Sequence, residues 1–194
     1  SDLKEALQNR GILFTMMMFF LIQVCVMLLQ PLITMYVGQL MGKVDDEAVQ
    51  MAGVIFSLAG ISGILAAPFW GNRGERYGYV RTFCYITLGA GVVNLFQFFT
   101  TDVYQFAIVQ FIFGLFLAGA IPNINANLAE VTDKSIRGKA FGLVTSAQMS
   151  GGFVGPLLGG ALGHVLPTRL VIICAGIILI GVSAFTYFTK VKGK

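Results

Sequence analysis

Residues 150–160 read Ser-Gly-Gly-Phe-Val-Gly-Pro-Leu-Leu-Gly-Gly and are the strongest indication of how this chain folds. Five glycines and one proline interrupt an apolar run that extends from Ala140 to Gly163. In a water-soluble helix each interior glycine costs about 1 kcal/mol and a proline about 3 kcal/mol. In a bilayer the backbone must be helical anyway, and small residues let a second helix approach closely. The stretch therefore predicts a membrane helix, with a helix-interface motif formed by Gly151, Gly155, Pro156, Gly159 and Gly160.

The composition also indicates a membrane protein. Hydrophobic residues make up 56% of the 194 residues and charged residues only 11%, whereas a soluble domain carries about 25% charged residues. No cluster of His, Cys, Asp or Glu has the spacing of metal ligands, and no Ser-His-Asp set is present. We therefore expect no enzyme, no cofactor, no metal site and no nucleic-acid partner, but a chain surrounded by the lipid bilayer.

Six apolar runs contain no Asp, Glu, Lys or Arg and are each about as long as the 20 residues needed to span a bilayer. They cover residues 11–38, 49–70, 82–100, 103–126, 140–163 and 170–189. We predict an all-α membrane protein with a six-helix transmembrane domain over residues 11–189. A lead-in over residues 1–10 and a tail over residues 190–194 complete the chain.

The basic residues predict the orientation. If the runs alternate in direction, only Lys43 and Arg169 of the 13 Lys and Arg residues lie on one side, and the remaining 11 lie on the other. Basic loops stay cytoplasmic. We therefore expect a multi-pass protein of the bacterial plasma membrane, with both termini in the cytoplasm. The external connections would be Met41–Ala48, Thr101–Asp102 and His164–Arg169.

An internal repeat accompanies these runs. Residues 62–71 and 150–159 both fit Ser-Gly-x4-Pro-x2-Gly, at an offset of 88 residues. This offset corresponds to three spans, and because three is odd the second copy crosses the membrane in the opposite sense. The pattern predicts an inverted 3+3 repeat, with units at about residues 11–100 and 103–189.

The segment that joins the second and third runs resembles a family signature. It reads Gly-Asn-Arg-Gly-Glu-Arg-Tyr-Gly-Tyr-Val-Arg over residues 71–81, and its pattern resembles the cytoplasmic motif of the major facilitator superfamily. The matching residues are Gly71, Glu75, Arg76, Gly78 and Arg81, whereas Tyr79 stands where a basic residue is expected. Residues 155–160 resemble the Gly-Pro-x-x-Gly-Gly signature of that superfamily's drug:proton antiporters. Residues 130–138 are similar to its second cytoplasmic-loop motif.

The resemblance implies one six-helix half of a multidrug efflux transporter that works by alternating access on small lipophilic substrates. Residues 110–114 read Gln-Phe-Ile-Phe-Gly and lack the arginine typical of N-terminal halves, so we expect the C-terminal half. A complementary six-helix half would complete the cavity, and protons would need a carboxylate from that partner. Two alternatives stay open: a self-sufficient half that works as a homodimer, and a membrane assembly subunit without transport activity.

The resemblance also implies two groups of site residues. A conformational latch would consist of Gly71, Glu75, Arg76, Gly78, Arg81, Glu130 and Arg137; alternatively, these charges only set the topology. A substrate cavity would be lined by Met16, Phe20, Gln23, Met27 and Gln30, which recur at i+3 and i+4, together with Gln110 and Phe113. The alternative is ordinary helix packing, with the glutamines hydrogen-bonded to each other.

Overall fold

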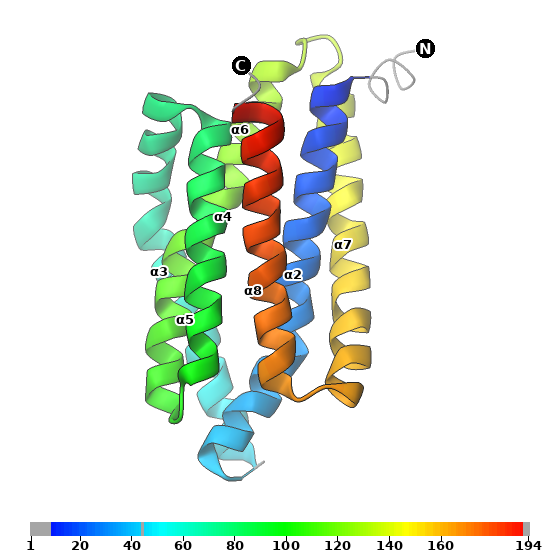
Figure 1. Ribbon diagram of the computed structural model, residues 1–194. Coiled ribbons are helices and arrows are strands. Elements are labelled where there is room, and N and C mark those ends of the chain that lie inside the picture. The colour runs from blue at the N-terminus through cyan, green and yellow to red at the C-terminus, as the bar shows by residue number, and fades with distance from the viewer. Residues whose placement is uncertain (1–8, 44, 192–194) are drawn as a thin grey trace.

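The computed structural model describes residues 9–43 and 45–191, which form a bundle of long helices (Figure 1). The predicted lead-in and tail lie largely outside the described residues. The elements are α2 (Arg10–Met41), α3 (Asp46–Tyr77), α4 (Tyr79–Phe96), the short 3-10 helix η1 (Gln97–Phe99), α5 (Val103–Leu117), α6 (Ala120–Val131), α7 (Arg137–Val165), α8 (Thr168–Thr186) and the π-helical turn η2 (Tyr187–Val191). The six predicted apolar runs coincide with these elements except at residue 100 and at residues 118–119, where the fourth run is divided between α5 and α6.

Five segments of the described chain are long and apolar enough to cross a membrane. They are α2, α3, α4 with η1 (Tyr79–Phe99), α5 with α6 (Val103–Val131) and α8 with η2 (Thr168–Val191). The predicted fifth span, α7, is a helix of 29 residues in the same bundle but is not among these five. Its glycines and serines lower its mean hydropathy, and these same small residues allow it to pack closely.

Two connections are shorter than predicted. The segment over residues 71–81, predicted to join the second and third spans, is almost entirely helical, because α3 continues to Tyr77 and α4 begins at Tyr79. Gly78 alone separates the helices, with a φ of 92° that favours glycine, and its N–H donates to the Gly74 carbonyl at 2.9 Å. The connection after α7 is likewise only residues 166–167, so the predicted His164–Arg169 loop is mostly helical.

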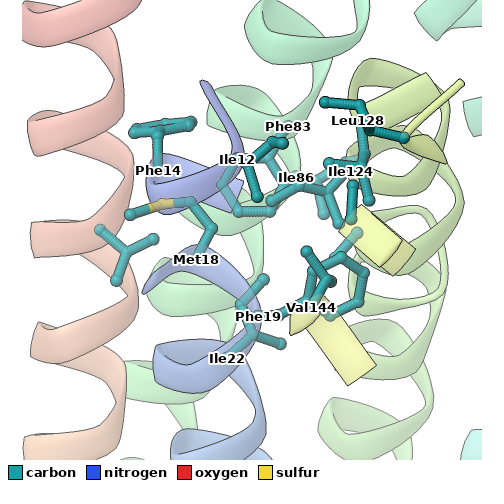
Figure 2. Packing of buried hydrophobic residues seen from close by; sticks show 14 residues of the cluster. Ile12, Phe14, Met18, Phe19, Ile22, Phe83, Ile86, Ile124, Leu128 and Val144 are labelled. Atoms are coloured by element: carbon teal, nitrogen blue, oxygen red, sulfur yellow. The ribbon is translucent and has the colours of Figure 1, made fainter. Parts of the chain in front are cut away.

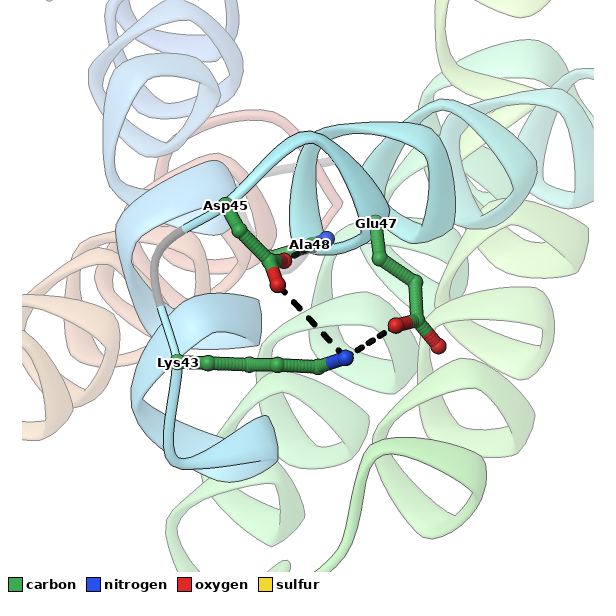
Figure 3. Close-up of polar contacts among 4 residues, drawn as sticks. All are labelled: Lys43, Asp45, Glu47 and Ala48. Carbon is green, nitrogen blue, oxygen red and sulfur yellow. Dashed lines mark hydrogen bonds and ion pairs between the residues drawn. The ribbon is translucent and has the colours of Figure 1, made fainter.

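The turn between α2 and α3 is held by polar contacts (Figure 3). The Asp45 carboxylate caps α3 by accepting a hydrogen bond from the Ala48 N–H at 3.1 Å. Lys43 Nζ lies 3.5 Å from the other Asp45 oxygen and also pairs with Glu47. The backbone hydrogen bond, assisted by the Lys43 charge, lowers the pKa of the Asp45 carboxyl. The carboxylate therefore stays ionised and continues to cap the helix.

The fourth predicted span is broken into α5 and α6 by a proline. Pro122 has no N–H to donate to residue 118, and its ring would clash with the carbonyl there. Gly119 sits at the break, where a methyl group would collide with the Trp70 ring of α3. Asn123 Nδ2 donates to the Gly119 carbonyl at 2.8 Å and to the Trp70 carbonyl at 3.2 Å. The chain at the break between α5 and α6 is thus held against α3 by packing and a hydrogen bond.

The glycine stripe of α7 packs against α2, which runs beside it in the same direction (Figure 1). A methyl group on Gly151 would lie 2.6 Å from the Phe20 carbonyl oxygen, and one on Gly155 would lie 3.0 Å from that of Val24. A methyl group on Gly159 would collide with the Leu28 carbonyl oxygen. The other two residues of the predicted motif, Pro156 and Gly160, are exposed and do not belong to the buried stripe. The helix that meets this stripe therefore belongs to the same chain.

Buried aliphatic and aromatic side chains fill the bundle at the end where α2 begins (Figure 2). Ile12, Met18, Phe83, Ile86 and Leu128, from α2, α4 and α6, are at most 2% exposed. Large apolar side chains also point outward: Ile64 is 76% exposed and Phe153 71% exposed. Such an outer surface suits acyl chains, where helices associate through close packing rather than through the hydrophobic effect.

Candidate functional site

A hollow of about 320 Å³ lies between α2, α3 and α5. Its wall is apolar except for three glutamines, Gln23 and Gln30 from α2 and Gln110 from α5. Gln30 and Gly60, which line it, are exposed, so the hollow opens at the surface of the bundle. An apolar wall with a few polar groups is typical of sites for small organic molecules.

The structure brings together four of the seven predicted cavity residues. Gln23, Gln30, Gln110 and Phe113 line the hollow, whereas Met16, Phe20 and Met27 do not. Met16 packs against the buried cluster of Figure 2 instead. Phe20 and Met27 lie along α7, where a methyl group on Gly155 would be 2.6 Å from Met27 Cβ. The three side chains share a helical stripe with the glutamines, but α7 covers part of that stripe.

Gln97, which the sequence reading overlooked, holds Gln110 in the wall of the hollow. Gln97 is 1% exposed, and its Nε2 donates to Gln110 Oε1 at 2.7 Å. The Gln97 carbonyl accepts hydrogen bonds from the Thr100 hydroxyl at 2.7 Å and from the Tyr36 hydroxyl at 3.4 Å. Arg169 Nη2 then donates to the Thr100 carbonyl at 3.2 Å. A glutamine inside an apolar run is itself a signal, because burying an amide among lipid requires a partner.

The other glutamines are held more loosely. Gln148 of α7 donates from Nε2 to Gln23 Oε1 at 3.5 Å, which is long for a hydrogen bond. Gln30 is exposed at the mouth of the hollow. The side-chain oxygen of Gln110 is therefore already hydrogen-bonded within the bundle, whereas Gln23 and Gln30 have polar atoms that a small molecule could reach.

The predicted latch residues lie at the opposite end of the bundle from the Lys43 turn. Five of them surround the junction of α3 and α4, whereas Glu130 lies near the end of α6 and Arg137 begins α7. Glu75, Arg76 and Arg81 are exposed on the helix ends themselves. The ion pairs recorded within residues 9–43 and 45–191 join Lys43 to Asp45 and Glu47, and none joins these latch residues to one another. Arg137 instead donates from Nη2 to the Ala129 carbonyl at 2.7 Å.

Arg73 is a second residue that the sequence reading left out of the site. Its guanidinium carbon lies 4.8 Å from the centroid of the Phe69 ring and 5.6 Å from that of Tyr77. The i, i+4, i+8 spacing of these residues on one helix would have indicated this stack. Within the described ranges, no three His, Cys, Asp or Glu residues are placed to hold a metal ion.

The chain matches known proteins along almost its full length. The family model of the Major Facilitator Superfamily matches residues 12–194. Multidrug resistance protein MdtG of Yersinia enterocolitica is 30% identical over 181 residues, which are 93% of this chain and 43% of that protein. MdtG of Escherichia coli O1:K1 is 30% identical over 173 residues, or 89% of this chain and 42% of that protein. The chain thus spans less than half the length of these relatives, and it belongs to the Major Facilitator Superfamily.

Proposed function

We propose that this chain forms one six-helix half of a multidrug efflux transporter that works by alternating access. The observation that carries the proposal is the hollow of about 320 Å³ with its apolar wall and three glutamines. Its volume and lining suit a small lipophilic molecule that is oriented by a few amide groups. The relatives from Yersinia and Escherichia are named multidrug resistance proteins, and this chain aligns with 42–43% of their length.

A second body is needed to enclose the substrate, because the hollow opens at the surface of the bundle. A complementary six-helix half is the partner we favour, with this chain as the C-terminal half and with both termini in the cytoplasm. Proton coupling would then use a carboxylate of the partner, since the six apolar runs of this chain contain none. The particle mass in detergent, from light scattering, separates this arrangement from a homodimer of this chain.

The helix pairing supports an inverted 3+3 repeat with units at about residues 11–100 and 103–189. The first and fifth spans, α2 and α7, meet along glycines, and so do the fourth and second, α5 and α3, where a methyl group on Gly114 would lie 2.9 Å from the Ala59 carbonyl. The third and sixth spans meet at Gly91 and Gly176, each facing the other's carbonyl. If the first three spans change places with the last three, so that span one replaces four, two replaces five and three replaces six, the same three pairs result. An inverted repeat requires this. Rocking of such a half against its partner provides alternating access.

The cavity assignment predicts a loss of substrate affinity in two variants. Gln23→Ala and Gln110→Ala each remove an amide from the wall, and each should weaken drug binding roughly threefold to tenfold, the value of one or two hydrogen bonds. Equilibrium binding of a fluorescent lipophilic cation and efflux from cells both measure this. Gln50→Ala is the matched control, because Gln50 is exposed on α3 and does not line the hollow. If binding and drug resistance are unchanged in both cavity variants, the assignment is wrong.

The latch assignment predicts a different phenotype for Glu75→Gln. If Glu75 pairs with a cation in one conformation of the transport cycle, its neutralisation should slow uptake several-fold, because that conformation loses a charge-assisted contact. The amount of protein inserted in the membrane should not change. Asp46→Asn, at the other end of α3, removes an exposed acidic residue far from the junction and serves as the control. Uptake kinetics equal to those of the unmodified chain would argue that Glu75 only sets topology.

A further inference from the structure

A second hollow, of about 420 Å³, lies where α3 ends and α4 begins. Four aromatic side chains and two arginines supply most of its lining: Phe69, Trp70, Tyr77, Tyr85, Arg73 and Arg81. No carboxylate lines it, so the hollow is electropositive. It is separate from the cavity between α2, α3 and α5, with which it shares no residue.

Arg73 is held in place by contacts that leave its charge uncompensated. The guanidinium stacks on the rings of Phe69 and Tyr77, at 4.8 and 5.6 Å from their centroids, and the Thr82 hydroxyl donates to the Arg73 carbonyl at 3.2 Å. A stacked guanidinium keeps its N–H donors in its own plane, directed away from the rings. None of the ion pairs recorded among the described residues includes Arg73 or Arg81. The hollow therefore contains preorganised donors for an anion.

The position of the hollow corresponds to the headgroup level of a bilayer. The uncharged run of α3 ends at Trp70, and Arg73 is the first charged residue after it. Tryptophan and tyrosine gather at the membrane interface, where one end of the ring is wet and the other apolar. Phe69, Tyr77 and Tyr85 are 50–59% exposed, so the hollow opens toward the surroundings of the bundle.

We propose that this hollow binds the phosphodiester group of an anionic phospholipid, with Arg73 and Arg81 as the phosphate ligands. Arginine matches the geometry of phosphate oxygens with two parallel N–H donors. A soluble phosphate offers the same chemistry to the arginines but would gain nothing from the exposed aromatic rings. A lipid places its glycerol and upper acyl carbons against these rings while its phosphate meets the arginines. Basic pockets between membrane helices are suited to such headgroups.

The chain contains its own reporter for this site, because Trp70 is its only tryptophan and lines the hollow. We would reconstitute the full chain in vesicles of phosphatidylcholine mixed with phosphatidylglycerol whose acyl chains are brominated, and measure quenching of Trp70 fluorescence. Quenching beyond that expected from the mole fraction gives the preference for phosphatidylglycerol. At about 1 kcal/mol, or fivefold, for each arginine near the surface, the two arginines together predict about a 30-fold preference. Arg73→Gln or Arg81→Gln should each reduce it to about fivefold, and Arg73→Lys should retain part of the difference.

Arg76→Gln is the matched control, since Arg76 lies on the same helix end but does not line the hollow. If the preference only reflects general attraction of anionic lipid to basic residues, Arg76→Gln and Arg73→Gln will lower it equally, and the proposal is overturned. An absent preference in the unmodified chain also overturns it. Inorganic phosphate, compared with chloride at equal ionic strength, should not reduce the quenching; if it does, the site takes soluble phosphate rather than lipid. Transport plays no part in this readout, so the outcome is independent of the proposed function.

Discussion

Replacing Gly159 with alanine is expected to lower the melting temperature of this chain by several degrees, whereas the same change at Gly160 should leave it unchanged or raise it. The two glycines are neighbours on α7, but only Gly159 is pressed against α2. A methyl group there would collide with the backbone carbonyl of Leu28. A backbone atom in a straight helix has no rotamer through which to move away, so α7 must shift off α2. Overpacking of this kind costs about 1–3 kcal/mol.

Gly160 provides the internal control, because a methyl group there has no heavy atom within 4 Å. Alanine favours helix over glycine by up to about 1 kcal/mol, so any effect of Gly160→Ala should be stabilising. Size-exclusion chromatography after heating in detergent gives both midpoints from the loss of the monodisperse peak. Equal midpoints for the two variants would mean that α7 does not pack against α2 through this stripe.

Replacing Gln97 with leucine should destabilise the bundle. It should also disturb the hollow between α2, α3 and α5, because Gln97 holds Gln110 in its wall. The change removes the donor that satisfies Gln110 Oε1 at 2.7 Å. Because Gln97 is 1% exposed and Gln110 5% exposed, water does not easily replace the lost partner. An unsatisfied buried polar group costs about 1–3 kcal/mol, and interhelical hydrogen bonds in membranes are worth up to about 2 kcal/mol.

A double-mutant cycle tests this pair. Gln97→Leu and Gln110→Leu should each destabilise, but the double variant should be about 1 kcal/mol more stable than the sum of the single effects predicts, because neither amide is then orphaned. Unfolding in mixed detergent and dodecyl sulfate micelles measures the free energies. Gln97→Leu combined with Gln23→Leu is the control, since Gln23 pairs with Gln148 instead. Additive effects at Gln97 and Gln110 would refute the hydrogen bond.

The pair also bears on whether Gln110 serves packing or substrate binding. Its oxygen is committed to Gln97, and the residue still lines the hollow. If Gln110→Leu loses more drug affinity than Gln97→Leu does, at equal stability, Gln110 makes a direct contact with the substrate. The same comparison at Gln23 uses Gln148→Ala as the variant that removes only the packing partner.

The order of residues along the chain was enough to predict an all-helical membrane protein and the approximate position of most of its helices. This follows from local physics: in lipid every backbone polar group must be satisfied inside its own segment, so an uncharged apolar run of sufficient length becomes a helix. The glycines of residues 150–160 likewise predicted a close helix contact, because their lack of side chains is a property of the sequence itself.

Which helix meets that stripe follows only from the folded chain. It is α2, and its contact with α7 takes Phe20 and Met27 out of the predicted cavity. The folded chain likewise shows that Gln97 reaches Gln110, and that α3 continues through Glu75 almost to the start of α4. Periodicity states which side chains share a face of a helix, but the neighbour that covers this face comes from elsewhere in the chain. The hollow between α2, α3 and α5 and the hollow at the junction of α3 and α4 are each lined by more than one helix. The order of residues along a single helix therefore does not predict them.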